Sequence, residues 1–310
     1  MKTSVAERWR YAAKPDSWGK LLVPFVLGQA MGLGPALDQE RNFSFARALF
    51  ALAFTVFDLL FIVFLNDYFD RDVDAIKRRM FPTGCSPKTI PDKILTASQL
   101  LLAGLLMGTL ALLTALGAEL LFEVRGATIA AFVSLGIFIA YSAPPLRLNY
   151  RGGGELLEML GVGLVLPWMS ALMQGDAWTS HALIFMPGFA LLSLSSAIAS
   201  GLSDERSDRM GGKRTVVTMI GNRLSRRAIE GLSVLGALAW MASAFFEMPL
   251  WVAIPAGLIV LVEVPTLRQK SDAADTDAFD AQRAYKCTLH TMIRHGALGL
   301  AVLLAIYELR

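Results

Sequence analysis

Residues 66–74 read Asn66-Asp67-Tyr68-Phe69-Asp70-Arg71-Asp72-Val73-Asp74, and they follow directly on an apolar stretch over residues 46–66. If a helix continues through them at about 100° per residue, four side chains fall within one arc of about 100°. These are Asn66, Asp67, Asp70 and Asp74, whereas Asp72 points away from the arc. The stretch therefore predicts a helix that ends with four oxygen-bearing side chains on one face.

The apolar stretch before this cluster is one of several that are long enough to cross a membrane. The chain of 310 residues is 55% hydrophobic and 18% charged, whereas an average soluble domain is about 25% charged. A spanning helix needs about 20 apolar residues. We expect an all-α, polytopic membrane protein with one domain over residues 1–310 and nine transmembrane helices, near 18–37, 46–66, 94–116, 126–142, 155–174, 181–201, 228–246, 249–266 and 290–308.

The basic residues predict how the helices are oriented. Most of the 29 lysines and arginines lie before residue 18 or in the loops after the second, fourth, sixth and eighth predicted helices. Because basic residues gather on the cytoplasmic side, we expect the N-terminus inside and the C-terminus outside. The N-terminal segment lacks a short apolar run followed by a cleavage site, so we expect a retained cytoplasmic tail. In a bacterium, the protein would lie in the cytoplasmic membrane.

A second acidic cluster ends the sixth predicted helix. It reads Asp204-Glu205-Arg206-Ser207-Asp208, with Asp204 and Asp208 one helical turn apart. Both clusters end even-numbered helices, so both are expected at the cytoplasmic membrane boundary. Facing carboxylates repel one another unless a cation lies between them, and Mg²⁺ combines a few carboxylates with phosphate oxygens of a substrate. Basic residues that suit a diphosphate follow both clusters, namely Lys77, Arg78, Arg79, Lys213 and Arg214.

Other polar residues have open roles at this point. Asp58 lies about two turns before the first cluster, where a charge is costly, and it either contacts polar groups within the bundle or lines a cavity. Tyr141 is either an interfacial anchor or, with Ser142, a contact for an acceptor or the diphosphate. Cys85 and Cys287 suit neither a disulfide framework nor a zinc cluster.

The two clusters resemble the motifs of the UbiA superfamily of intramembrane prenyltransferases. The first motif, N-D-x-x-D-x-x-x-D, is matched by Asn66, Asp67, Asp70 and Asp74. The second, D-x-x-x-D before a G-K-R-T-like run, is matched by Asp204, Asp208 and residues 212–215. The Tyr141-Ser142-Ala143-Pro144-Pro145 segment with Arg147, and Lys14-Pro15 with Pro24 and Gly28, are also similar to the family.

The resemblance implies a ring of nine helices around a cavity that opens sideways to lipid. It also implies two Mg²⁺ ions, held on the diphosphate by Asp67, Asp70, Asp74, Asp204 and Asp208. Asn66 and Lys213 would contact the diphosphate or metal, and Tyr141, Ser142, Arg147 and Asp58 are candidates for the acceptor cavity. The chain departs from the family pattern at 77–82, so it stays open which of Lys77, Arg78 and Arg79 meets phosphate.

The expected reaction is Mg²⁺-dependent transfer of a prenyl group to an aromatic acceptor through an allylic carbocation. Residues 150–155 are similar to a segment of the dihydroxynaphthoate prenyltransferases, which favours an acceptor of quinone biosynthesis. The first motif is more like the hydroxybenzoate and chlorophyll-synthase branches. We expect an isoprenyl diphosphate, an aromatic small molecule and the bilayer as partners, and no nucleic acid.

Alternatives on the same scaffold are a UbiA-type terpene cyclase and a (bacterio)chlorophyll or other tetrapyrrole prenyltransferase. A cation-coupled transporter would place its charges near the bilayer midplane, usually with broken helices or repeats. The acidic clusters instead lie at the boundary. A CDP-alcohol phosphotransferase would carry a D-G-x-x-A-R signature, which neither cluster contains.

Overall fold

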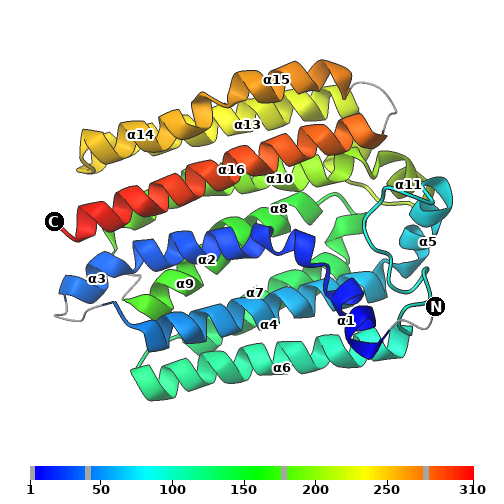
Figure 1. Ribbon diagram of the computed structural model, residues 1–310, viewed down its shortest axis with the longest axis horizontal. Helices are drawn as coiled ribbons and strands as arrows, with labels where there is room; N and C mark the ends of the chain where they lie inside the picture. The colour runs from blue at the N-terminus through cyan, green and yellow to red at the C-terminus, as the bar shows by residue number, and fades with distance from the viewer. Residues whose placement is uncertain (1–3, 39–42, 176–179, 275–278) are drawn as a thin grey trace.

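The computed structural model describes residues 4–38, 43–175, 180–274 and 279–310 and consists there of helices and loops. The helices run side by side along the long axis of the molecule (Figure 1). The long elements are α2 (Gly19–Met31) with α3 (Leu33–Asp38), α4 (Phe45–Phe69), α6 (Ala97–Phe122), α7 (Ala127–Ser142), α8 (Gly154–Glu158) continued by a π-helix (Met159–Val165) and α9 (Leu166–Gln174), α10 (Met186–Leu202), α13 (Asn222–Ala242), α14 (Leu250–Leu261) with α15 (Val264–Ala273), and α16 (Phe279–Glu308).

The predicted all-helical membrane fold is confirmed. Eight helical segments in the described part of the chain are long and apolar enough to cross a membrane. The predicted segment 126–142 corresponds to α7, which is apolar but has only 16 residues. Each of the nine predicted segments therefore contains a helix, and the fourth is shorter than the usual span.

Each helical segment packs against the next one along the chain. Contacts join α2 to α4, α4 to α6, α6 to α7, α7 to α8, the π-helix to α10, α10 to α13, α13 to α14 and α14 to α16. Contacts between α16 and α2 then close the ring. The helix α1 (Val5–Ala13) and the C-terminal end of α16 lie at opposite ends of the bundle (Figure 1).

Close packing of α6 on α4 supports the helix that carries the first acidic cluster. Gly104 and Gly108, one turn apart on α6, face Leu65 and Phe61 of α4 so closely that an added Cβ would clash with either side chain. Small residues at such contacts let two membrane helices approach one another. Leu65, directly before Asn66, is fully buried as a result.

Two helix starts differ from the sequence prediction. We expected helices to begin near 228 and 290, but α13 begins at Asn222 and α16 at Phe279. The added turns carry Arg223, Arg227, Arg283 and other polar residues. Apolar residues alone underestimate the length of such helices. The backbone hydrogen bonds of a helix do not change where it leaves the membrane, so its polar turns continue into water.

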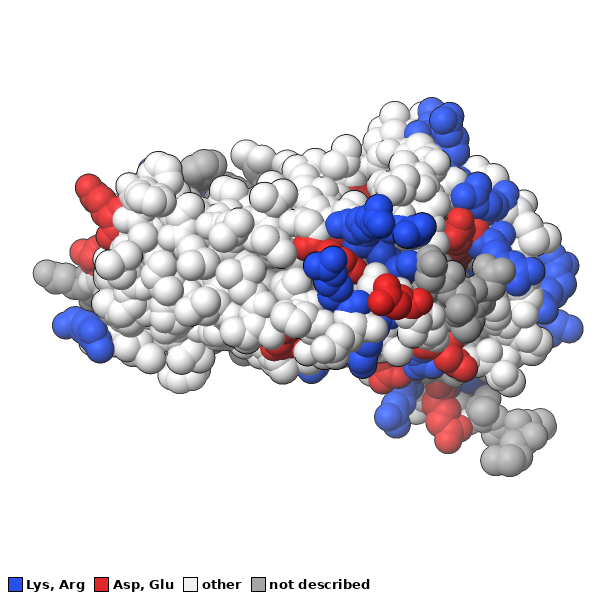
Figure 2. Space-filling model, turned by 90° about the horizontal axis from the view of Figure 1, so that it is seen from above, with Lys and Arg blue, Asp and Glu red and all other residues white. Residues whose placement is uncertain are grey.

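Short helices gather at one end of the bundle, where the chain is charged. They are α1 (Val5–Ala13), α5 (Arg71–Met80), α11 (Glu205–Met210) and α12 (Val216–Ile220). Figure 2 shows most of the charged side chains of this face at that end, next to a broad surface without charge. Both acidic clusters lie at the charged end, as the topology predicted.

Candidate active site

The first acidic cluster spans a break between two helices. α4 ends at Phe69, and Asp70 (φ −95°, ψ 7°) joins it to α5. The Asp70 amide donates to the Asn66 carbonyl at 2.9 Å, and the Asp74 amide donates to the Asp70 carbonyl at 2.8 Å. These two bonds keep the one-turn spacing of a helix across the break. Asp67, Asp70 and Asp74 therefore stay on one face of the chain, and all three are buried. Asp72 is exposed, in agreement with its predicted direction.

The second cluster is built on a short helix and a tight turn. Asp204 precedes α11, and its carbonyl accepts a 2.8 Å hydrogen bond from the Asp208 amide. The Lys213 amide then donates to the Asp208 carbonyl at 2.8 Å. Gly212 adopts φ +76° in this turn, a conformation that glycine accepts at little cost. The turn brings Lys213 back toward the aspartates.

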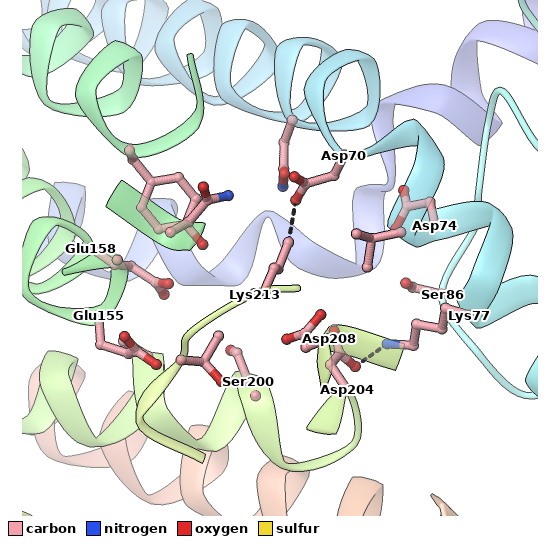
Figure 3. A pocket seen from close by; sticks show the side chains of 18 of the residues that line it. Asp70, Asp74, Lys77, Ser86, Glu155, Glu158, Ser200, Asp204, Asp208 and Lys213 are labelled. Carbon is pink, nitrogen blue, oxygen red and sulfur yellow. Dashed lines mark hydrogen bonds and ion pairs between the residues drawn. The ribbon is translucent and has the colours of Figure 1, made fainter. Parts of the chain in front are cut away.

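Both clusters line one polar cavity of about 280 Å³ (Figure 3). Its aspartates are the five predicted from the two motifs, and Asn66 lies beside them. Five lysines also line the cavity, namely Lys14, Lys20, Lys77, Lys88 and Lys213. Segments far apart in the sequence therefore converge on a site that is rich in both charges.

Four of the five motif aspartates form ion pairs with lysines. Lys14 pairs with Asp67, Lys77 with Asp204 and Lys88 with Asp74. Lys213 lies 2.6 Å from Asp70, and Figure 3 marks this pair and the Lys77–Asp204 pair. The sequence prediction included Lys77 and Lys213 but missed Lys14 and Lys88 as site residues. Lys14 belongs to the Lys14-Pro15 segment, which matched the family, whereas Lys88 lies in a loop that gives no periodic signal.

Burial and neighbouring charges shift the pKa values of three ionisable side chains at the site. Burial would raise the pKa of Asp204, but the ammonium groups of Lys77 and Lys88 outweigh it and hold that pKa below its usual value. Burial raises the pKa of Asp208 to about 7, with a further contribution from the charge of Asp204. Burial would lower the pKa of Lys213, but Asp70 and Asp208 raise it, so Lys213 stays charged.

Neighbouring groups hold several of these side chains in place. The Tyr150 hydroxyl donates to Asp70 at 3.1 Å, and the Thr89 hydroxyl donates to Asp67 at 2.6 Å. Arg147 donates to the Phe69 carbonyl at 3.1 Å and stacks 3.6 Å over the Tyr150 ring. Sequence reasoning missed both Thr89 and Tyr150.

The donor set fits a hard divalent cation. It consists of carboxylate oxygens and Asn66, whose buried Oδ1 has no hydrogen-bond partner. Within the described ranges, no group of three His, Cys, Asp or Glu residues stands close enough to hold a metal ion alone. Magnesium commonly binds through one or two carboxylates together with substrate phosphates. The site therefore suits magnesium that arrives with a diphosphate.

Of the three basic candidates after the first motif, Arg78 and Arg79 lie outside this cavity. Arg78 donates to Asp92 at 2.6 Å and to the Pro82 carbonyl at 3.2 Å, and Arg79 is exposed. On α5, successive residues point about 100° apart, so three consecutive side chains cannot all face the cavity. Lys77 is the one of the three that lines it.

A second cavity, also of about 280 Å³, adjoins the first. It is lined mainly by apolar side chains, including Leu59, Ile62, Phe138 and Leu166. Asp58 lines it as well and also contacts a polar group of the bundle, so both arrangements expected for this residue are present. Asp58 Oδ2 accepts a 3.3 Å hydrogen bond from Ser134, and its buried Oδ1 has no partner.

Of the other acceptor candidates, only Tyr141 lies at the cavities, and it lines both. Ser142 is fully buried, away from either cavity. Arg147 also lies outside, on the Tyr150 ring and the end of α4. Ser142 follows Tyr141 by one residue, so it points to another side of α7.

Comparisons with known proteins agree with this architecture. A 247-residue stretch, 76% of the chain, is 25% identical to the bacteriochlorophyll synthase 34 kDa chain of Chloroflexus aurantiacus and covers 73% of that protein. A 194-residue stretch, 60% of the chain, is 24% identical to the chloroplastic chlorophyll synthase of Arabidopsis thaliana. That match spans 48% of the plant protein, so the chain covers only about half the length of that relative.

Solved structures share the fold. A UbiA homologue from Archaeoglobus fulgidus, bound to DMAPP and Mg²⁺, superposes with a TM-score of 0.69 at 17% identity, over 95% of this chain and 99% of that one. The apo structure of a UbiA homologue from Aeropyrum pernix gives a TM-score of 0.62 at 13% identity, over 87% of this chain and 96% of that one. The sequence model of the UbiA prenyltransferase family matches residues 21–287, and the chain belongs to that family.

Proposed function

We propose that the protein transfers a prenyl group from an isoprenyl diphosphate to an aromatic acceptor, with Mg²⁺. The observation that carries the proposal is the joining of two unlike cavities, one polar with five aspartates and five lysines, the other apolar. An isoprenyl diphosphate likewise has a charged end, which matches the polar cavity, and a hydrocarbon chain, which matches the apolar cavity. The named ligands of the Archaeoglobus homologue, DMAPP and Mg²⁺, support the same assignment.

In this proposal the lysines bind the diphosphate. Lys77 and Lys213 pair with Asp204 and Asp70. Asp70 and Asp204, with the other motif aspartates, would hold Mg²⁺, which would supply positive charge to the carboxylates and to the phosphate oxygens. The ammonium groups are then free to donate charge-assisted hydrogen bonds to the diphosphate. Because they meet the leaving group as its charge develops, they stabilise the breaking of the C1–O bond.

The apolar cavity protects the resulting cation from water. Its walls of Ile62, Phe138 and Leu166 exclude solvent and contact the prenyl chain or the acceptor. Phe138 and Tyr141 stand nearly parallel, with ring centroids 6.2 Å apart. Flat rings of this kind favour stacking with an aromatic acceptor. Asp58 offers an acceptor hydroxyl or amino group a hydrogen-bond partner.

Two kinds of acceptor fit the proposal. The segment at 150–155 favours a quinone precursor. The names of the relatives, chlorophyll and bacteriochlorophyll synthases, favour a tetrapyrrole. On the strength of that segment we place the small aromatic ring first, and the assay below includes both kinds of acceptor.

The test is a transfer assay with detergent-purified protein. Radiolabelled geranyl, farnesyl and geranylgeranyl diphosphate are each combined with hydroxybenzoate, dihydroxynaphthoate, homogentisate or chlorophyllide, with Mg²⁺ or with EDTA. We expect a prenylated product that requires Mg²⁺ and is lost in both Asp67→Ala and Asp208→Ala. A labelled hydrocarbon formed without acceptor would indicate a cyclase. No consumption of any diphosphate by folded protein would contradict the proposal.

A further inference from the structure

Transfer to an aromatic carbon requires a base. The ring carbon that attacks the prenyl group still carries its hydrogen, and aromaticity returns only when that proton leaves. The motif aspartates line the diphosphate cavity alone, where they are assigned to metal and lysines. This inference rests on the proposed function, and it concerns the residue that takes the proton.

The reacting carbon must lie where the two cavities meet, because C1 joins the diphosphate to the hydrocarbon chain. Among the described residues, five line both cavities: Lys14, Lys20, Asn66, Tyr141 and Glu158. Glu158 is the one carboxylate in this set. Glu155, one turn earlier, lines the polar cavity only, and its carboxylate accepts a 2.7 Å hydrogen bond from the Val216 amide.

The local backbone places Glu158 at this junction. Glu158 is the last residue of α8, directly before the π-helix Met159–Val165. A π-helical turn is wider than an α-helical turn and is frequent at functional sites. Figure 3 shows Glu155 and Glu158 entering the polar cavity from the side opposite Asp74 and Lys77.

A lysine holds this carboxylate in place. Lys20 of α2 forms an ion pair with Glu158, and its ammonium also donates to the Ser200 hydroxyl at 3.3 Å. The ion pair ties the Glu158 carboxylate to α2 at the junction of the two cavities.

We propose that Glu158 is the general base of the transfer and that Lys20 positions it. The C1–O bond breaks and diphosphate leaves with the electron pair. A bond then forms between C1 and a ring carbon of the acceptor. The C–H electrons of that carbon return to the ring while its proton passes to a carboxylate oxygen of Glu158. Protonated Glu158 releases the proton to water through the polar cavity after the diphosphate departs.

The experiment separates binding, ionisation and transfer in Glu158→Gln. The matched control is Glu230→Gln, which makes the same change at a glutamate of α13 that lines neither cavity and accepts a 3.4 Å hydrogen bond from Tyr285. We expect Glu158→Gln to bind geranylgeranyl diphosphate and to form prenyl alcohol in water without acceptor, as the wild type does. Transfer to the acceptor should fall about 100-fold or more, because general bases contribute that much.

An isotope effect distinguishes a base from a positioning group. With an acceptor deuterated at the attacked carbon, Glu158→Gln should show a larger primary isotope effect than the wild type, because proton removal becomes rate-limiting. Glu158→Asp keeps the carboxylate, so it should transfer faster than Glu158→Gln. If Glu158→Gln does not fold, the isotope effect in Glu158→Asp decides the matter, and an unchanged value contradicts the proposal.

Two results would overturn the assignment while the enzyme itself works. One is transfer by Glu158→Gln at the wild-type rate; the other is a loss of diphosphate binding as large as the loss of transfer. If the wild type consumes no isoprenyl diphosphate, the proposed function fails first and the base assignment fails with it. The wild-type assay therefore tells the two failures apart.

Discussion

At the scale of single residues, the ion pairs of the polar cavity distinguish Lys77 from its neighbours. Lys77 is buried and paired with Asp204, whereas Arg79 is exposed. We expect Lys77→Met to raise the KM for the isoprenyl diphosphate about 10- to 100-fold, the value of one charge-assisted hydrogen bond. Arg79→Met should leave KM unchanged. Equal effects of both substitutions in steady-state kinetics would contradict the placement of Lys77, provided that thermal unfolding shows both variants to be folded.

Asp58 illustrates a conflict between stability and function. It is 2% exposed within α4 and has one neutral hydrogen bond, from Ser134. A charge at the centre of a membrane helix costs about 3 kcal/mol. We therefore expect Asp58→Asn to raise the thermal unfolding midpoint and also the KM for the acceptor, with no change in the KM for the diphosphate.

A suitable control for that experiment is Thr55→Val on the same helix. Thr55 is buried, donates to the Ala51 carbonyl at 2.8 Å and lies outside both cavities. It should leave both KM values as they are. A lower unfolding midpoint in Asp58→Asn would show that the carboxylate stabilises the bundle, against the prediction.

Sequence spacing predicted the residues of the site where they lie on helices. The angular argument separated Asp72 from Asp70 and Asp74. Applied to residues 77–79, the same argument excludes Arg79 but leaves Arg78 only about 20° outside the arc, so it does not separate Arg78 from Lys77. The angular argument could not find Lys88 or Thr89, because it applies only to residues on a helix. These two residues lie in a loop, and only the path of the folded loop brings them to the cavity. Glu158 was equally hidden, since its role depends on a junction between cavities.

At the scale of elements, Asp92 holds the loop after α5 in place through hydrogen bonds. Its carboxylate accepts hydrogen bonds from the Tyr11 hydroxyl at 2.5 Å, from Arg78 at 2.6 Å and from the Lys88 amide at 3.1 Å. Burial would raise the pKa of Asp92, but the hydrogen bonds from Tyr11 and Arg78 hold it below its usual value. Burial and the contact with Asp92 raise the pKa of Tyr11 to about 12. The contacts join α1, α5 and the loop that presents Lys88.

We expect Asp92→Asn to reduce the free energy of unfolding by about 1 kcal/mol near neutral pH. Because the folded pKa of Asp92 is depressed, its stabilisation is complete above the unfolded pKa of about 3.9 and disappears as pH falls through the lower folded pKa. Unfolding of wild type and variant in detergent, measured between pH 3 and pH 7, checks this. A difference that is independent of pH would contradict the role of the charged form.

At the scale of the whole molecule, the apolar segments predicted an all-helical membrane fold and where along the chain its helices lie, and eight helical segments of the described residues are long enough to cross a membrane. The sequence alone did not predict that α16 packs against α2 and closes the ring, because pairing between the ends of the chain leaves no periodic trace; only the family resemblance implied it. The sequence also did not predict the shape of the cavities. Asn66 of α4 and Tyr141 of α7 both reach the junction of the cavities because α4 and α7 contact each other directly.

The orientation of the bundle in the membrane determines on which side each loop lies. With cytoplasmic lysines and arginines, the charged end of the bundle should face the cytoplasm. Arg79 lies at that end, and Arg125 lies in the loop between α6 and α7, at the opposite end; both are exposed. We expect a membrane-impermeant maleimide to label Arg125→Cys in intact cells or right-side-out vesicles.

The same reagent should reach Arg79→Cys only after the membrane is opened or inverted. Both variants are made in a Cys85→Ser, Cys287→Ser background, since the chain has two cysteines. The opposite labelling pattern would place the polar cavity outside the cell. Because prenyl diphosphates are too highly charged to cross a bilayer unaided, that pattern would separate the site from a cytoplasmic supply of substrate and would count against the proposed transfer.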